Sequence, residues 1–405
     1  MMRVRVPGPM LQVLCALALG LLLGWAEPAL AVRFKPLSDG FIFVIGLLVV
    51  PIVFVTVTSG LAGMGSLRRM GRTGFCALLY FEAMSALSLA TGLCAGWLVQ
   101  PGERLDAIGA GAPAAAAPTA GVAWAHMLGA SPVLQALLAA LACALLLTAF
   151  GRRAAGVQRA CQRAANGLFR LVRLVLKAAP LAAFGAIAYA AGRHGPGSIG
   201  ALATLVAALY LASALFIVTA MGAIAWLCGF SLPRLLLALR EELVLAATTS
   251  SSVAAMPGLM QKLEKAGCPR TLVAAVVPAG YSFNLNGSNI YLGMGLVFLA
   301  QLQHAPLSWG ICANMLAMLM LMSKGASGVA GAAFMVLAAS AAVLPAGSEA
   351  GLALLLGVER LLKCRVLANL TGNAVACLAI AAWSGQLDYR ALVESGIGRR
   401  QVASI

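Results

Sequence analysis

Residues 278–292 read PAGYSFNLNGSNIYL, and residues 365–373 read RVLANLTGN. The pentapeptide at 284–288, Asn-Leu-Asn-Gly-Ser, interrupts an otherwise apolar run, and Asn-Leu-Thr-Gly-Asn at 369–373 is a second version of it. Irregular polar backbone at the depth of a membrane is tolerated where it lines a cavity or is buried in protein. The two pentapeptides therefore predict an internal repeat that places polar atoms at the midplane of a membrane.

Two further interruptions precede the pentapeptides. AATTSSSVAAMP at 246–257 and SKGASGVAGAAF at 323–334 each separate apolar stretches that are too short to cross a bilayer alone. Each lies about 35 to 40 residues before its pentapeptide, and such segments are typical of re-entrant hairpins. Paired interrupted segments in corresponding positions indicate the binding site of a secondary transporter that is built from inverted repeats.

The composition indicates a membrane protein. Of the 405 residues, 62% are hydrophobic and 10% are charged, whereas a soluble domain has about 25% charged residues. The 28 Lys and Arg outnumber the 12 Asp and Glu and give a formal net charge of +16, which in a soluble protein suggests nucleic-acid binding. Here the basic residues gather in alternate loops, so they indicate membrane topology and no nucleic-acid partner.

Apolar runs of about 20 residues predict six transmembrane helices before residue 230, at 10–31, 40–65, 74–99, 123–150, 166–191 and 199–229. Arginines follow the second, fourth and sixth of these runs, including Arg159 and Arg163 in the loop after the fourth. We expect these loops and the N-terminus to face the cytoplasm. The first run also has the pattern of a signal peptide, so its removal is the alternative to a first transmembrane helix.

Charged residues lie within the last apolar segment, where they indicate function by default. Arg365 precedes Asn369 by four residues, so both project from one helical face. A guanidinium matches a carboxylate bidentately, which predicts an anionic substrate at Arg365. An ion pair with Glu359 is the alternative for Arg365 and the favoured interpretation for Arg360. Glu359 is interpreted either as a proton carrier or as the permanent partner of an arginine.

Other chemistries lack their motifs. The sequence has no Walker A motif, and its three histidines and ten cysteines form no catalytic set and no CxxC pair. Amide side chains and unwound carbonyls are instead hard oxygen ligands for a small cation. We therefore expect a protein that is not an enzyme and needs no cofactor beyond Na⁺ or H⁺ as a coupling ion.

The chain resembles the dicarboxylate/amino acid:cation symporter family, which includes glutamate transporters, and within it the bacterial aerobic C4-dicarboxylate transporters. The resemblance extends from about Gln12 to Arg390. Besides the stretches at 278–292 and 365–373, it rests on KPLSDGF (35–41), SGLAGMGSLRRMGRTG (59–74), LLYFEAMS (78–85), GFSLPRLLLALREEL (229–243), TSSS (249–252) and SKGASGVAG (323–331).

The resemblance implies an all-α membrane protein with eight transmembrane helices and two re-entrant hairpins, forming a homotrimer that works as an elevator. Residues 1–229 would form the first six helices, mostly a trimerisation scaffold, with the third and sixth helices packing against the transport domain. The implied transport core spans 230–386, with hairpin 1 at about 236–266, a broken helix 7 at about 271–302, hairpin 2 at about 308–346 and helix 8 at about 347–384. Residues 387–405 would be a cytoplasmic tail, and both termini would lie on the cytoplasmic side of the bacterial inner membrane.

The resemblance also implies roles for individual residues. Arg365 matches the arginine that binds the distal substrate carboxylate, and the tip of hairpin 2 matches a gate. The implied substrate-binding residues are Ser250, Ser251, Ser252, Ser288, Gly328, Val329, Gly331, Arg365 and Asn369. The implied cation-binding residues are Ser85, Gly280, Ser282, Asn284, Asn286, Ser323, Asn369 and Asn373.

Some positions depart from the family pattern. Leu362 stands where amino-acid-transporting members have the aspartate that receives the substrate ammonium, which favours a plain dicarboxylate. Asn286 and Val253 stand where relatives have carboxylates, Ala330 stands where proline or threonine is usual, and Glu359 replaces an aspartate in a register one residue shorter. The loss of two carboxylates predicts fewer coupled cations or coupling to protons.

We therefore expect a symporter in the lipid bilayer that imports succinate, fumarate or malate with sodium ions or protons. The alternatives are a glutamate or aspartate symporter, a transport-impaired subunit that senses dicarboxylates, and an uncoupled anion channel. The expected partners are the dicarboxylate, its coupling cations, lipid and further copies of the chain.

Overall fold

The computed structural model describes residues 9–62, 71–103, 132–150, 154–194, 197–304, 307–325, 331–341 and 348–399. Regular structure in these ranges is helical, apart from one isolated bridge between Phe230 and Gly398. Within the same ranges, five segments are long and apolar enough to cross a bilayer: Pro28–Val55, Arg72–Val99, Gly156–Arg193, Gly200–Leu227 and Lys363–Trp383. The prediction of an all-α membrane protein is confirmed for this part of the chain, whereas eight transmembrane helices and an elevator remain predictions.

The polarity of the molecule is inverted relative to a soluble protein. Large apolar side chains lie on the outside, such as Trp25, Leu211 and Trp309 at 78%, 70% and 80% exposure. Asparagines and serines are buried in the interior instead. Such an apolar surface promotes aggregation in water, whereas lipid or a neighbouring apolar chain covers it without desolvating polar groups.

The first helix is shorter than its apolar run. Helix α1 (Pro9–Ala26) ends before Pro28, because the proline ring restricts the preceding residue to extended backbone. A short α2 (Pro28–Ala31) and a 3₁₀ turn, η1 (Val32–Phe34), then lead into α3 (Lys35–Ala62). The predicted span at 10–31 is therefore wrong at its C-terminal end.

The region predicted to be a basic loop after the fourth span is helical. After α7 (Pro132–Phe150), α8 runs over Ala155–Val175, so Arg159 and Arg163 lie on an amphipathic helix and not in a loop. A 3₁₀ turn, η3 (Leu176–Ala178), follows, and α9 (Ala179–His194) begins with Pro180 in its first turn. Proline is tolerated there because the first turn of a helix has no internal partner for that N–H.

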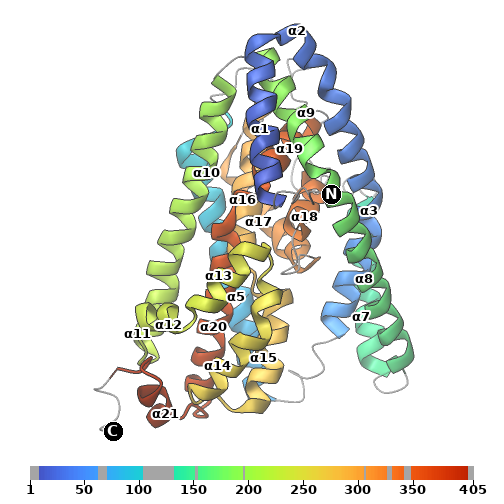
Figure 1. The fold of residues 1–405 in the computed structure, drawn as a ribbon. Coiled ribbons are helices and arrows are strands. Elements are labelled where there is room, and N and C mark those ends of the chain that lie inside the picture. The colour runs from blue at the N-terminus through green and yellow to red at the C-terminus, as the bar shows by residue number, and fades with distance from the viewer. Residues whose placement is uncertain are drawn as a thin grey trace, which may run out of the picture.

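Helices α5 (Arg72–Val99) and α16 (Asn286–Leu302) cross at close range. A methyl group added to Gly92 would overlap the carbonyl of Ile290, and one added to Gly293 would overlap the carbonyl of Leu89. Small residues at such crossings let backbones approach closely, which is how helices associate in membranes. Every residue of α16 is buried, and α16 also packs against α20 (Lys363–Trp383). Figure 1 shows α20 in red in the middle of the molecule, among α5, α13 and α16.

The sixth span consists of α10 (Gly197–Phe216), a π turn, η4 (Ile217–Met221), and α11 (Gly222–Leu227). The elements of the expected transport core follow in chain order. They are α12 (Leu232–Ala238), α13 (Arg240–Thr249), η5 (Ser252–Ala255), α14 (Met256–Lys265), α15 (Arg270–Phe283), α16, α17 (Trp309–Met322), η6 (Ser323–Gly325), α18 (Ala332–Ala341), α19 (Ser348–Glu359), α20 and α21 (Tyr389–Glu394).

The segment expected as one helix at 347–384 is two helices. The chain leaves helical geometry between Glu359, which ends α19, and Lys363, which begins α20. Tyr210 on α10 holds this break, because its hydroxyl donates a hydrogen bond of 2.7 Å to the carbonyl of Leu361. Arg360 therefore lies in a turn and not within an apolar span.

The segment expected as a tail packs back onto the chain. Asp388 caps α21 because its Oδ1 accepts hydrogen bonds from the backbone N–H groups of Arg390 and Ala391. Arg234 on α12 donates a hydrogen bond of 3.0 Å to the carbonyl of Gly398, and Leu392 is fully buried. The described part of this segment, up to residue 399, is thus attached to the start of the transport core.

Candidate functional site

The first pentapeptide is the break between α15 and α16. Asn284 and Leu285 leave helical geometry, and the side chain of Asn284 donates hydrogen bonds of 3.1 Å to the carbonyl of Gly372 and 3.3 Å to Oδ1 of Asn373. Gly280 provides the space for this contact, because an added methyl group there would overlap Oδ1 of Asn373. The broken helix and the second pentapeptide therefore lie against each other.

Asn369 and Ser288 are paired at the same level. Oδ1 of Asn369 accepts from the backbone N–H of Ser288 at 3.1 Å, and its Nδ2 donates to the Ser288 hydroxyl at 2.9 Å. Both residues are buried. Since Ser288 lies in the first turn of α16, Asn369 satisfies one of the N–H groups that a helix start leaves without an internal partner.

Several buried amide oxygens around this contact lack a partner in the described part of the chain. They include Oδ1 of Asn284 and Oδ1 of Asn286. Such a group carries a substantial desolvation cost unless water or an ion satisfies it. Carboxamide and carbonyl oxygens are ligands that small hard cations accept, so these atoms fit a cation. Ser282, also predicted to bind cations, lies partly buried in the last turn of α15.

Arg365 is buried at the start of α20 and paired on one side. Its Nη2 lies 2.6 Å from Oε1 of Glu359, and both side chains are 5% exposed. Its guanidinium carbon lies 5.3 Å from the ring centre of Tyr291. Its Nη1 has no hydrogen-bond partner within the described ranges. The ion pair predicted for Glu359 thus forms with Arg365, and the expectation that Arg360 is the partner is wrong, because Arg360 lies in the turn before α20.

The tip of hairpin 1 meets the same turn of α20. Ser250 ends α13 in the left-handed region at a φ of 54°, which turns the chain sharply toward η5. Its hydroxyl accepts a hydrogen bond from Nζ of Lys363. Ser251 continues in extended backbone, and the hydroxyl of Ser252 is buried without a partner in the described part of the chain. A polar tip therefore faces a cationic helix start.

Hairpin 1 is held together by an internal ion pair. Nζ of Lys262 on α14 lies 2.7 Å from Oε2 of Glu242 on α13, and it also donates to the carbonyl of Ala238 at 2.7 Å. Gly258 leaves room for the Glu242 carboxylate, because an added methyl group would lie against it. This carboxylate is therefore a structural group and has its own cation.

The described residues include only part of hairpin 2. Ser323 is buried in η6, and its hydroxyl donates to the carbonyl of Met320 at 3.1 Å. Gly331 starts the second arm with a φ of 83° and packs against Leu176 of η3. Gly328 and Val329, predicted to bind substrate, lie outside the described residues.

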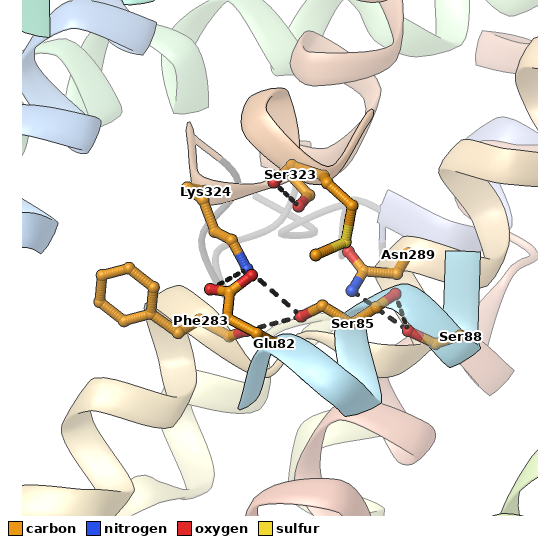
Figure 2. A network of polar contacts seen from close by, with 8 residues as sticks. Glu82, Ser85, Ser88, Phe283, Asn289, Ser323 and Lys324 are labelled. Carbon is orange, nitrogen blue, oxygen red and sulfur yellow. Dashed lines mark hydrogen bonds and ion pairs between the residues drawn. The ribbon is translucent and has the colours of Figure 1, made fainter. Parts of the chain in front are cut away.

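A second polar network joins hairpin 2 to α5 (Figure 2). Nζ of Lys324 lies 2.8 Å from Oε1 of Glu82 and 3.5 Å from Oγ of Ser85. The Ser85 hydroxyl donates to the carbonyl of Phe283 at 2.8 Å, where α15 ends. Ser88 donates to the carbonyl of Ser85 at 3.0 Å, and Asn289 on α16 donates to the Ser88 hydroxyl at 3.2 Å. The network thus joins four elements, α5, α15, α16 and η6, of which α5 lies about 200 residues or more before the others in the sequence.

Besides the residues at the break between α15 and α16, the structure brings other predicted residues into two groups. Ser250, Ser252, Ser288, Arg365 and Asn369 lie at or beside the start of α20. Ser85 and Ser323 lie in or beside the second network. The roles assigned to all of these residues remain predictions.

Sequence reasoning gave no role to Lys324, Lys363 or Tyr210. A charge within a membrane segment is the signal that could have identified the two lysines. Tyr210 had no comparable signal, because a tyrosine is ordinary in an apolar helix.

Comparisons with known proteins cover nearly the whole chain. The model of the sodium:dicarboxylate symporter family matches residues 10–383. A C4-dicarboxylate transport protein from Sinorhizobium medicae is 41% identical and covers 97% of this chain and 91% of its own length. C4-dicarboxylate transport protein 1 of Ralstonia nicotianae is 42% identical, with 96% and 95% coverage. A C4-dicarboxylate transport protein from Burkholderia multivorans is 41% identical, with 97% and 96% coverage.

These matches agree with the resemblance carried by the pentapeptides and hairpin segments, and they indicate a transport protein rather than an enzyme. The chain belongs to the sodium:dicarboxylate symporter family.

Proposed function

We propose that the protein imports C4-dicarboxylates such as succinate, fumarate or malate across the bacterial inner membrane, in symport with cations. The observation that carries this proposal is the half-satisfied guanidinium of Arg365, whose Nη1 is buried without a partner among the described residues. A guanidinium in that state needs an anion, and a carboxylate matches its geometry.

The charge around Arg365 fits a dianion. The run from Glu359 to Arg365 contains three cations and one carboxylate, which leaves a formal charge of +2. A fully ionised C4-dicarboxylate carries two negative charges and neutralises this cluster. The relatives from Sinorhizobium medicae and Ralstonia nicotianae are named C4-dicarboxylate transport proteins, which supports the same substrate class.

Leu362 argues against an amino acid substrate. It caps the start of α20 and is 2% exposed. An α-ammonium group bound one turn before Arg365 would therefore meet an apolar side chain and leave its charge buried without a partner, which is costly. Glutamate or aspartate transport is the less favoured alternative for this reason.

Cation coupling is supported by the unpartnered amide oxygens near the broken helix. Oδ1 of Asn284 and of Asn286 are buried and have no partner among the described residues. They are neutral, so a cation bound to them would gain stabilisation from the nearby substrate charge. We propose that this reciprocal dependence couples cation and substrate. Glu359 is paired with Arg365. Its carboxylate could therefore carry a proton only if this ion pair opens.

The proposal includes a homotrimeric assembly, an elevator mechanism and cytoplasmic termini. The support for these three features is the family membership, because relatives of one family share an architecture. The exposed apolar side chains on α3 and α10, such as Phe43 and Leu211, fit coverage by lipid or by further copies of the chain.

The test is uptake of labelled succinate by proteoliposomes of the purified protein under an imposed sodium gradient, an imposed inward proton gradient, or neither. Accumulation driven by either gradient supports a symporter and identifies its ion. Binding without uptake under any gradient would instead support the dicarboxylate-sensing subunit. Downhill flux that shows no counterflow of unlabelled against labelled succinate would indicate a channel.

A further inference from the structure

Lys324 is a mostly buried cation in the first arm of hairpin 2. Its side chain is 13% exposed, and it lies in η6 between Ser323 and the glycine-rich tip. Burying an ammonium group is costly unless other groups replace its hydration. The groups around Nζ must therefore compensate for the lost hydration of this positive charge.

The neighbours of Nζ are groups that can ligate a cation. Glu82 supplies a carboxylate oxygen at 2.8 Å and Ser85 a hydroxyl oxygen at 3.5 Å. The Ser85 hydroxyl gives its proton to the carbonyl of Phe283, so its lone pairs are left for a positive charge. The ring of Phe283 also lies 5.9 Å from Nζ, and an aromatic face attracts cations. Figure 2 shows these groups converging from α5 and α15 on the end of the lysine side chain.

Without the ammonium group, the same place would offer oxygen ligands to a free ion. A carboxylate, a hydroxyl and a nearby backbone carbonyl are the donors that hard cations prefer. The site is also beside the helix break that carries the amide oxygens of Asn284 and Asn286. A sodium ion and the Lys324 ammonium group would therefore compete for one position.

We propose that Lys324 is a tethered cation that permanently fills a cation position beside Ser85, so that the first arm of hairpin 2 docks on α5 without a sodium ion there. This inference deepens the proposed symport and rests on it for its consequence, although the site itself does not depend on the substrate. A covalently attached cation is not released inside the cell. It therefore holds the hairpin in place but contributes nothing to the driving force.

The exposures of the two side chains favour this interpretation over an incidental surface pair. Glu82 is 45% exposed, whereas Lys324 is 13% exposed, so the lysine is the more deeply buried partner. An exposed pair between two flexible side chains contributes little. Here the ammonium group leaves most of its solvent and also contacts the Ser85 hydroxyl, which is what a cation ligand set requires.

The test is the sodium response of Lys324→Gln, measured without substrate. Thermal unfolding of the purified protein in detergent is compared in sodium chloride and in choline chloride at equal ionic strength. Lys324→Gln leaves the Glu82 carboxylate and the oxygens around it, so we expect sodium to raise its unfolding temperature more than that of the wild type. Lys324→Arg keeps the tethered charge and should respond as the wild type does.

The double variant Glu82→Gln/Lys324→Gln is the charge-balanced control. It removes the carboxylate that would hold sodium, so the gained sodium response should disappear. If Lys324→Gln aggregates in choline but is folded in sodium, the inference is supported. If it aggregates in both salts while the double variant folds in both, sodium does not replace the lysine and the inference is overturned.

An equal sodium response in the wild type and in Lys324→Gln would also overturn the inference, because the lysine would then block no ion. Succinate affinity measured on the same samples separates this result from failure of the proposed function. We expect sodium to tighten succinate binding by Lys324→Gln at least about tenfold more than binding by the wild type. A wild type that binds no succinate would contradict the proposed function and leave the thermal test of Lys324 valid.

Discussion

Replacing Arg365 by glutamine should destabilise the protein and abolish dicarboxylate binding for two separable reasons. Arg365 and Glu359 are each 5% exposed and lie 2.6 Å apart. Removing one partner of a buried ion pair leaves an uncompensated charge and costs about 3–5 kcal/mol. Truncating one side of a buried charged contact with a ligand costs about 2–5 kcal/mol, which corresponds to a loss of affinity of at least about 30-fold.

The double variant Glu359→Gln/Arg365→Gln separates these effects. It removes both charges, and the two amides can still hydrogen-bond, so we expect its stability to return to within about 1 kcal/mol of the wild type. Binding should remain lost, because the group that receives the substrate carboxylate is still absent. Unfolding in detergent reports the first effect, and titration with labelled succinate reports the second.

Two results would refute this reasoning. Succinate binding by the double variant within threefold of the wild type would show that Arg365 serves only to neutralise Glu359. Unchanged stability of the single Arg365→Gln variant would show that the buried pair is not formed in the membrane protein. Glu359→Gln alone provides a further check, since it should free the guanidinium while leaving the anion-binding group in place.

Three further predictions concern the same region. Gly287→Ala should prevent folding, because its methyl group would overlap the α20 backbone, whereas Gly46→Ala on α3 meets nothing within 4 Å and should be neutral in the same thermal assay. Lys363→Gln should weaken succinate binding more than Arg360→Gln does. Both variants remove one positive charge, but of the two residues Lys363 is the one that bonds to Ser250 at the tip of hairpin 1. Equal losses of affinity would show that only the total charge matters. Asn286→Asp should increase the sodium dependence of succinate uptake by adding a charge to a buried neutral ligand, and an unchanged sodium response would remove Asn286 as the limiting group.

The polar breaks could be located from the sequence because they depend on local chemistry. Asn284 and Asn286 interrupt an apolar run. At membrane depth such amide side chains are tolerated only where they line a cavity or are buried in protein. The structure places the break at Asn284 and Leu285, against Asn373 of the second pentapeptide. The repeat predicts polar atoms of both copies near the midplane, and the structure adds that the two copies pair there.

The break before α20 could not be found in the same way. Its residues include Leu361 and Leu362, which continue an apolar pattern, and the group that fixes it is the hydroxyl of Tyr210, about 150 residues earlier in the chain. The contact of Lys324 with Glu82 is similarly non-local. Hydrophobic periodicity reports which face of a helix is buried, but it does not report which distant side chain satisfies a charge or a carbonyl.

The pairing of three carboxylates in and around the core gives the proposed cycle its electrostatic basis. Glu82 is paired with Lys324, Glu242 with Lys262 and Glu359 with Arg365. Each of these carboxylates already has a tethered cation, so none of them is left as an unpaired charge for a free ion. The excess charge of the core is therefore positive and lies beside the start of α20.

A positive core that crosses a low-dielectric barrier carries a large desolvation cost, which falls when an anion neutralises it. A dianion at Arg365 removes the +2 of the surrounding cluster, whereas a monoanion would leave half of it. The same arrangement that selects two carboxylates therefore also favours movement of the loaded core over the empty one. In this scheme, substrate charge determines whether the core can cross, and the neutral amides of the broken helix add cations only once that charge is present.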